Sequence, residues 1–220
     1  MGLVSMEFVV LCDFDGTVAM IDTAELVLHK FAHGDWQIYD EYLENGEITL
    51  EECMKKQLSF LRASKEQILD ELKDVVRFRP NFEELGEYCT QNRIPLIIAS
   101  AGLDFVIKYF LDSRDWSRFV TTYTAKTSLD TAGWSLTFPS LLDKESANFK
   151  QDLVRSLKRQ GKTVIFIGDG NGDYAASAEA DYPFAIKGSK LARLCKNHGI
   201  PCVEIEDFKV VEQTLRNMMM

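Results

Sequence analysis

Long apolar runs are missing from this sequence of 220 residues. No segment approaches the ~20 consecutive apolar residues that a transmembrane helix needs, so we expect no membrane partner. Basic residues are also fewer than acidic ones, 25 against 34, and the formal net charge is -9. A surface with this charge disfavours non-specific binding to nucleic acid or to anionic membranes.

Disulfide, metal-binding and targeting patterns are lacking as well. The five cysteines are odd in number and contain no CxxC pair, and the three histidines show no ligand spacing. Free thiols in a reducing cytoplasm are the simplest interpretation, so we expect a cytoplasmic protein. Residues 1–6 have neither the basic start nor the length of a signal peptide, and position 6 does not fit a myristoylation motif. Met1 and Met6 both stay open as the natural start.

The sequence does contain an alternation of apolar strand-like runs with segments of helical periodicity. Short runs bounded by glycine, proline or polar residues predict buried parallel strands at residues 8–12, 96–100, 163–167, 183–186 and 202–203. Helical segments lie between them and after the last one. This order predicts the α/β class, with a Rossmann-like parallel sheet wrapped by helices.

Two insertions interrupt the alternation. About four helices without a strand between them are predicted after the first strand, over residues 23–32, 36–43, 49–61 and 65–76. We therefore predict a helical-bundle cap domain over residues 18–77, inserted into an α/β core of residues 1–17 and 78–220. Residues 119–124 and 134–138 alternate with period two and predict a small antiparallel flap.

Polar side chains stand where three of the predicted strands end. Asp13 and Asp15 follow the first strand, Ser100 ends the second, and Asp169 and Asp173 follow the strand over 163–167. Ligands of open α/β sheets bind beyond the carboxyl ends of the strands, so we expect these groups to converge. A divalent hard cation relieves the repulsion between four carboxylates most simply. The expected cofactor is Mg²⁺, with Asp13, Asp15, Asp169 and Asp173 as its site.

Two neighbouring acids with different roles suit phosphoryl transfer. One carboxylate beside a metal-bound phosphoryl group can attack phosphorus and form an aspartyl-phosphate. The other can protonate the leaving oxygen and then deprotonate the water that cleaves the intermediate. Gly16 and Thr17 open the turn after Asp15 and offer backbone N–H groups to an anion.

The stretch from Asp13 to Thr17, DFDGT, resembles the DxDGT signature of the haloacid dehalogenase superfamily, and matching residues follow in that family's order. The resemblance implies that Asp13 is the nucleophile and Asp15 the general acid and base. It also implies that Asp169 and Asp173 hold Mg²⁺. Phosphoryl oxygens would be bound by Gly16, Thr17, Ser100, Ala101, Gly102 and Lys150. Dehalogenases of the superfamily lack an acid at the position of Asp15, so the chain looks like a phosphatase.

The place of the helical insert is similar to that in the phosphoserine phosphatase-like branch. Within this branch, SAGLDF from Ser100 and GDGNGDYAASAEADYPFA from Gly168 look most like the methionine-salvage phosphatases, which act on 2-hydroxy-3-keto-5-methylthiopentenyl-1-phosphate. Three positions differ from a phosphoserine phosphatase, namely Asp22, Gln57 and Gly172. The resemblance implies a small phosphomonoester as substrate, and the cap offers Asp22, Glu25, Trp36, Tyr39 and Gln57 as candidate contacts.

Several alternatives remain. Ser100 could cap the helix that starts at Asp104, instead of binding phosphate or in addition to it, and Lys144 rivals Lys150 as the phosphate-binding lysine. Asp22 and Glu25 are more often a helix cap and a solvated face than substrate ligands. Phosphoserine phosphatase is the nearest alternative function, and a regulatory aspartyl-phosphate switch is the alternative from another class. The sequence leaves a homodimer open.

Overall fold

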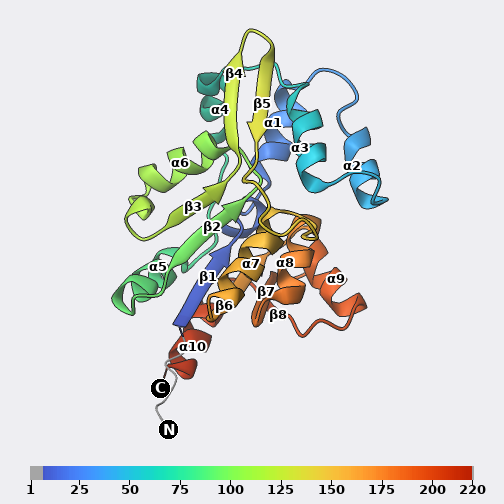
Figure 1. The fold of residues 1–220 in the computed structure, drawn as a ribbon. Helices are drawn as coiled ribbons and strands as arrows, with labels where there is room; N and C mark the ends of the chain where they lie inside the picture. Colours follow the sequence, from blue (N-terminus) through green and yellow to red (C-terminus); the bar gives the residue numbers. More distant parts are fainter. Residues whose placement is uncertain (1–6, 220) are drawn as a thin grey trace.

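The computed structural model describes residues 7–219, so the choice between Met1 and Met6 falls outside the described residues. Its main feature is a sheet of six parallel strands in the order β3-β2-β1-β6-β7-β8 (Figure 1). The strands are β1 Glu7–Cys12, β2 Leu96–Ser100, β3 Thr121–Thr124, β6 Lys162–Gly168, β7 Tyr182–Ile186 and β8 Val203–Ile205. The predicted α/β fold with a Rossmann-like parallel sheet is confirmed.

Both faces of the sheet are buried, which explains the continuous apolar strands. Alternate side chains of β1 point to opposite faces. Val9 and Leu11 pack into one core with Phe166 and Val154, and Val10 joins the larger core on the other face. Parallel strands with helices on both sides require this pattern, because neither face meets water.

Six helices of residues 7–219 pack around the sheet, and further helices lie beyond one of its ends. Those packed around the sheet are α5 Phe82–Gln91, α6 Asp104–Ser113, α7 Phe149–Arg159, α8 Tyr174–Glu179, α9 Lys190–Asn197 and α10 Lys209–Met218. Three short helical turns also occur, η1 Phe14–Val18, η2 Trp116–Arg118 and η3 Asn171–Asp173. No helix within residues 7–219 is long and apolar enough to cross a membrane.

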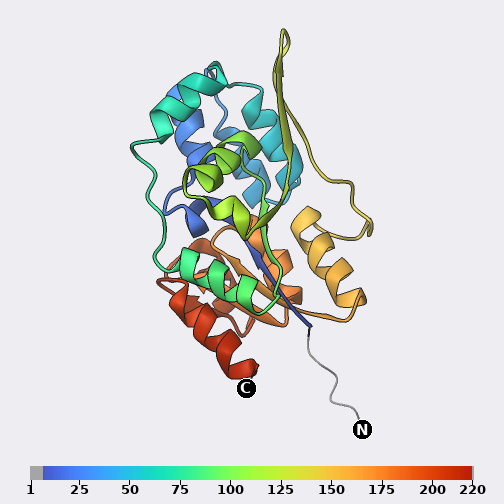
Figure 2. The same cartoon turned by 90° about the vertical axis from the view of Figure 1, so that its left-hand side faces the viewer.

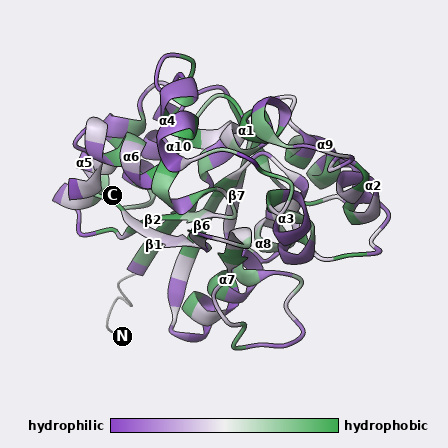
Figure 3. Cartoon of the chain, turned by 90° about the horizontal axis from the view of Figure 1, so that it is seen from above, coloured by the Kyte–Doolittle hydropathy of each residue, from purple (hydrophilic) through white to green (hydrophobic). Residues whose placement is uncertain are grey.

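Four helices between η1 and α5 lie together beyond the carboxyl end of the sheet (Figures 1 and 2). They are α1 Thr23–Phe31, α2 Ile38–Glu44, α3 Leu50–Leu58 and α4 Lys65–Leu72, and we call them the cap helices. The predicted capping box is present at the start of α3, where Thr49 and Glu52 exchange hydrogen bonds. Seen from above, α3 and α4 carry mostly hydrophilic residues, as expected for helices that face solvent on one side (Figure 3).

Two chain segments connect the cap helices to the sheet and pair with each other. Ala19 and Phe78 form an isolated antiparallel bridge. The N–H of Met20 donates to the carbonyl of Arg77 at 2.8 Å, and the N–H of Arg79 donates to the carbonyl of Val18 at 2.9 Å. The entry and exit of the cap helices therefore run side by side.

The predicted flap exists, but its first strand was placed wrongly. Residues 119–124 do not pair with 134–138; instead β3 joins the main sheet parallel to β2. The flap is the antiparallel pair β4 Lys126–Asp130 and β5 Gly133–Thr137, which stands beside the cap helices in Figure 2. A tight turn decides the pairing: Gly133 has φ +111°, and the N–H of Ala132 donates to the Asp130 carboxylate at 2.7 Å.

Candidate active site

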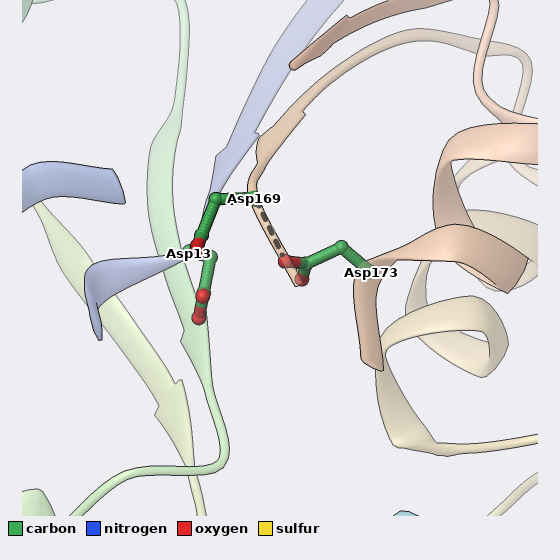
Figure 4. A group of neighbouring side chains, drawn as sticks. All are labelled: Asp13, Asp169 and Asp173. Atoms are coloured by element: carbon green, nitrogen blue, oxygen red, sulfur yellow. Dashed lines mark hydrogen bonds between the residues drawn. The ribbon is translucent and has the colours of Figure 1, made fainter. Parts of the chain in front are cut away.

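The strand order brings the predicted site residues together. β1 lies between β2 and β6, and Cys12 is in register with Ile98 on one side and Ile167 on the other. The residues that follow these positions, Asp13 and Asp169 among them, therefore emerge at the same edge. Figure 4 shows Asp13 at the end of β1, Asp169 at the end of β6 and Asp173 at the start of α8.

Three carboxylates form a compact group at this edge. One oxygen each of Asp13, Asp169 and Asp173 lies within 4.8 Å of the others. The Asp173 carboxylate accepts the N–H groups of Asp169 and Gly170, both at 3.0 Å, and Thr17 donates its hydroxyl to Asp169 at 2.8 Å. An all-oxygen donor set of this kind suits a hard divalent cation.

Burial and mutual repulsion disfavour the charged forms of this group. Burial, then the charge of Asp173, raises the pKa of Asp13 to about 7. Burial, then the charges of Asp13 and Asp173, raises the pKa of Asp169 to about 8. Both shifts indicate a place where a cation would be stabilised.

Lys150 supplies one positive charge to the group. Its ammonium donates to Asp13 at 2.8 Å and to Asp173 at 2.7 Å, and the residue is 3% exposed. Burial lowers the pKa of Lys150, but the two carboxylates outweigh this effect and raise it. Asn148 caps α7, so Lys150 lies in the first helical turn. The rival Lys144 is exposed.

The Asp15 carboxylate is not part of the three-carboxylate group and is held by Thr23. One of its oxygens accepts the N–H of Thr23 at 2.9 Å and the Thr23 hydroxyl at 2.5 Å. The other oxygen is buried without a hydrogen-bond partner. Burial, then the charge of Asp22, raises the pKa of Asp15 to about 8. A carboxyl group whose pKa is raised in this way holds its proton more tightly and can act as a general acid.

Glycines allow the carboxylates to approach the backbone. A Cβ at Gly102 would lie 2.1 Å from the free oxygen of Asp15, and a Cβ at Gly16 would lie 2.2 Å from Asp169. Ser100 is 1% exposed, and its hydroxyl accepts the N–H of Gly102 at 3.1 Å. It does not cap α6, whose N-cap is Leu103. Ser100, Ala101 and Gly102 all line a cavity above the carboxylates.

A cavity of about 430 Å³ opens over these groups and reaches the cap helices. Asp13, Asp15, Asp169 and Asp173 line it at the sheet, together with Lys150. On the cap side it is lined by Asp22, Ala24, Glu25, Leu28, Trp36, Asp40, Leu43, Glu44, Leu50, Cys53, Met54 and Gln57, which we call the cap wall. A small metabolite with a phosphate group would fit this volume.

Four of the predicted substrate contacts, Asp22, Glu25, Trp36 and Gln57, belong to the cap wall, and Tyr39 does not line the cavity. Asp22 also caps α1, since its carboxylate accepts the N–H of Glu25 at 2.8 Å. Gln57 is 4% exposed, and its amide donates to Asp40 at 2.8 Å. The helix-cap role expected for Asp22 is therefore present, and its contact with a substrate stays a prediction.

Sequence reasoning missed several residues of the site. On the cap wall, Asp40, Leu43 and Glu44 lie at helical spacing from Trp36, a periodicity that could have identified them. No such periodicity identifies Arg79 from the sequence. It is 9% exposed and donates to the carbonyls of Gly16 at 2.9 Å and Thr17 at 2.8 Å, so it holds the turn after Asp15 in place.

Comparison with known proteins agrees with this geometry. Residues 10–178 match the model of the haloacid dehalogenase-like hydrolase family, and this range contains every carboxylate of the site. The chain belongs to the haloacid dehalogenase-like hydrolases.

Relatives of this hydrolase include named phosphatases. It is 29% identical over 96% of its length to 2-hydroxy-3-keto-5-methylthiopentenyl-1-phosphate phosphatase of Geobacillus kaustophilus (strain HTA426), covering 97% of that protein. The enzyme of the same name from Brevibacillus brevis (strain 47) is 29% identical over 82% of this chain and 83% of its own. Family membership and these relatives together support phosphatase activity.

Solved structures of similar fold include phosphoserine phosphatases. A phospho-aspartyl intermediate analogue of phosphoserine phosphatase superposes with a TM-score of 0.70, at 15% identity over 96% of this chain and 99% of that one. Phosphoserine phosphatase from T. onnurineus superposes with a TM-score of 0.66 at 18% identity, over 99% of this chain and 98% of that one. At this identity the likeness concerns the fold.

Proposed function

We propose that this hydrolase cleaves small phosphomonoesters with the help of Mg²⁺, through an aspartyl-phosphate on Asp13. The observation that carries the proposal is the group formed by Asp13, Asp169, Asp173 and Lys150 at the floor of a metabolite-sized cavity. We further propose that residues 18–77 act as a cap domain on a core of 1–17 and 78–220, and that the protein is cytoplasmic. A homodimer remains an untested prediction.

The donor set fits Mg²⁺. Asp13, Asp169 and Asp173 would hold the ion, and the raised pKa values of Asp13 and Asp169 show that Lys150 alone does not offset the burial and mutual repulsion of these carboxylates. When bound, the ion would neutralise and orient a phosphoryl group. Asp15 was also predicted as a ligand, but its carboxylate is held by Thr23. We therefore assign the Asp15 side chain to proton transfer.

The chain's own residues divide the remaining work. Asp13 is oriented by Lys150 and attacks phosphorus with a carboxylate oxygen, and we assign Lys150, Ser100 and the backbone N–H groups of Thr17 and Ala101 to the phosphoryl oxygens. The predicted N–H donors of Gly16 and Gly102 instead bind the Ile21 carbonyl and the Ser100 hydroxyl. Asp15 then donates its proton to the leaving oxygen, which frees the alcohol. The resulting Asp15 carboxylate takes a proton from the water that hydrolyses the intermediate, and this step restores both acids.

Metal removal is the direct test of this function. We expect the purified protein to hydrolyse an aryl phosphate, to lose activity in excess chelator and to recover it with added Mg²⁺, because three carboxylates need a cation beside a phosphate dianion. A release assay for inorganic phosphate measures this. Full activity in excess chelator would contradict the metal assignment, and formation of a phosphoprotein without phosphate release would favour the regulatory switch.

The pH dependence tests the role of Asp15. A general acid must be protonated, so kcat/KM should fall above about pH 8, where the raised pKa of Asp15 lies. Part of that elevation comes from the charge of Asp22. In Asp22→Asn the pKa of Asp15 drops, and the alkaline limb should move to lower pH by up to about one unit.

Asn is a suitable replacement for Asp22 because it also caps helices and accepts the N–H of Glu25. Glu71→Gln, on α4 and paired with Lys30, is the matched control and should leave the limb in place. An alkaline limb that stays at the same pH in Asp22→Asn would refute the assignment.

The relatives suggest a first physiological substrate. Their names make 2-hydroxy-3-keto-5-methylthiopentenyl-1-phosphate the metabolite to assay first, and with it a place in methionine salvage. Phosphoserine is the alternative, given the fold likeness. The cationic side chains of residues 7–219 that line the cavity are Lys150 and Lys190, and both already pair with carboxylates of the protein, so a substrate carboxylate would lack a free, matched partner. We therefore rank phosphoserine lower.

A further inference from the structure

The cap helix α3 contacts the core at the start of α7, the helix that carries Lys150. The carboxylate of Glu51, in the first turn of α3, accepts the N–H of Phe149 at 3.0 Å, across 98 positions of the chain. Phe149 is the first residue of α7, and Lys150 is the second. A residue of the cap therefore completes the end of the helix from which the lysine of the site extends.

The N–H groups at the start of a helix have no partner within that helix. In α7 the Asn148 side chain accepts two of them, those of Lys150 at 3.1 Å and Gln151 at 3.0 Å. The N–H of Phe149 needs another acceptor, and this residue is 1% exposed, so water is a poor substitute. Glu51 supplies the acceptor, and its negative charge suits the positive end of the helix dipole.

A second contact joins the cap to the same corner of the core. Leu50, at the start of α3, packs against Gly172 of η3, where a Cβ would lie only 2.8 Å from the Leu50 side chain. The amide of Asn148 donates to the carbonyl of Gly172 at 2.9 Å, so η3 and the start of α7 are tied together. The next residue, Asp173, is one of the two carboxylates that accept from the Lys150 ammonium.

The position of Lys150 depends on the first turn of α7. Its ammonium donates to Asp13 at 2.8 Å and to Asp173 at 2.7 Å, and the residue is buried. A shift of this turn would lengthen both hydrogen bonds and release Asp13 from its orientation. Glu51 lies outside the cavity lining, so it acts on the site through the turn that it holds.

We propose that Glu51 is a positioning residue: by holding the first turn of α7 against the cap, it sets Lys150 against Asp13 for the attack on phosphorus. This inference rests on the proposed phosphatase function and adds a cap residue to the groups that orient the nucleophile. Glu51 takes no part in the bonds that form and break. Because its effect is on the phosphoryl end of the cavity, it does not depend on the group attached to the phosphate.

Removal of the acceptor is the first test. In Glu51→Ala we expect kcat/KM to fall about 10-fold, mainly through kcat, because a misplaced orienting group slows the chemical step. Glu51→Gln keeps an acceptor for the Phe149 N–H and should recover most of this loss. Wild-type kinetics in Glu51→Ala, or an equal loss in Glu51→Gln, would overturn the inference.

Glu41→Ala is the matched control, since it removes an exposed carboxylate of the neighbouring cap helix α2. Its kcat/KM should equal that of the wild type. A loss equal to that of Glu51→Ala would mean that any missing cap carboxylate slows the enzyme, and would refute the specific role of Glu51.

A double-mutant cycle tests whether Glu51 acts through Lys150. In a Lys150→Met background, Glu51→Ala should cost little further activity, because the group that it positions is gone. Activities are compared in Mg²⁺ per amount of folded protein, measured by circular dichroism. Losses that add would show that the two residues act independently and would refute the positioning role.

Two substrates with different tails separate this role from recognition of the tail. An aryl phosphate and 2-hydroxyethyl phosphate share only the phosphate, so Glu51→Ala should lower kcat/KM for both by the same factor, within about 2-fold. A loss confined to one of them would assign Glu51 to tail recognition and overturn the inference. If the wild type hydrolyses neither phosphate in Mg²⁺, the phosphatase function itself is rejected; if only the Glu51 variants behave unexpectedly, that function stands.

Discussion

Asp13→Asn is expected to abolish turnover, by on the order of 10⁴-fold or more, because an amide cannot replace the attacking carboxylate. The fold should survive, since the amide oxygen can still accept from Lys150 and the buried charge at this position is unfavourable in the absence of a cation. Steady-state phosphate release and thermal denaturation measure the two quantities.

Trapping the intermediate assigns the nucleophile directly. Radiolabelled substrate should leave phosphate on the protein, or beryllium fluoride should attach to a carboxylate, in the wild type and not in Asp13→Asn. Asp70→Asn, an exposed acid on α4, should behave like the wild type in both assays. Label found on Asp15 or Asp169 would reverse the roles assigned to these acids.

Lys150→Met should have the largest effect on stability. The change leaves Asp13 and Asp173 buried without their cationic partner, which costs roughly 3–5 kcal/mol when a buried ion pair is broken. The loss should be smaller with Mg²⁺ present, because a cation compensates the same carboxylates. Urea denaturation with and without Mg²⁺ measures the free energy of unfolding.

Lys144→Met is the matched control for this change. Lys144 is exposed and lies six positions before Lys150. The free energy of unfolding of the Lys144→Met protein should therefore stay within about 0.5 kcal/mol of the wild type. Activity should fall by about 10²-fold or more in Lys150→Met and stay unchanged in the control. A comparable loss of activity in Lys144→Met would restore it as the functional lysine.

Many residues of the candidate active site could be predicted because they stand where strands end. A run of apolar residues that stops at Asp13, and another that stops at Asp169, report both a buried parallel strand and the edge where it ends. The parallel arrangement then places both ends at one edge. The capping box at Thr49 and Glu52 is equally local, because its two hydrogen bonds join residues three apart.

Pairings between distant segments required the tertiary structure. Residues 121–124 have the same composition in a hairpin as at the edge of a parallel sheet, and only the alternative pairing of β4 with β5 excluded the hairpin. The position of the Asp15 carboxylate against Thr23, rather than beside Asp13, depends on the sharp turn at Gly16.

The amino-acid sequence by itself determined the chemistry: an α/β fold, strand-end carboxylates and a helical insertion placed to cover them. The tertiary structure alone decided how charge is distributed in the cavity. Lys190 neutralises Glu44 across 146 positions, and Asp40 accepts the amide of Gln57 from α3. Local periodicity carries no information about such partners, because the energy of a charge depends on which distant groups share its surroundings.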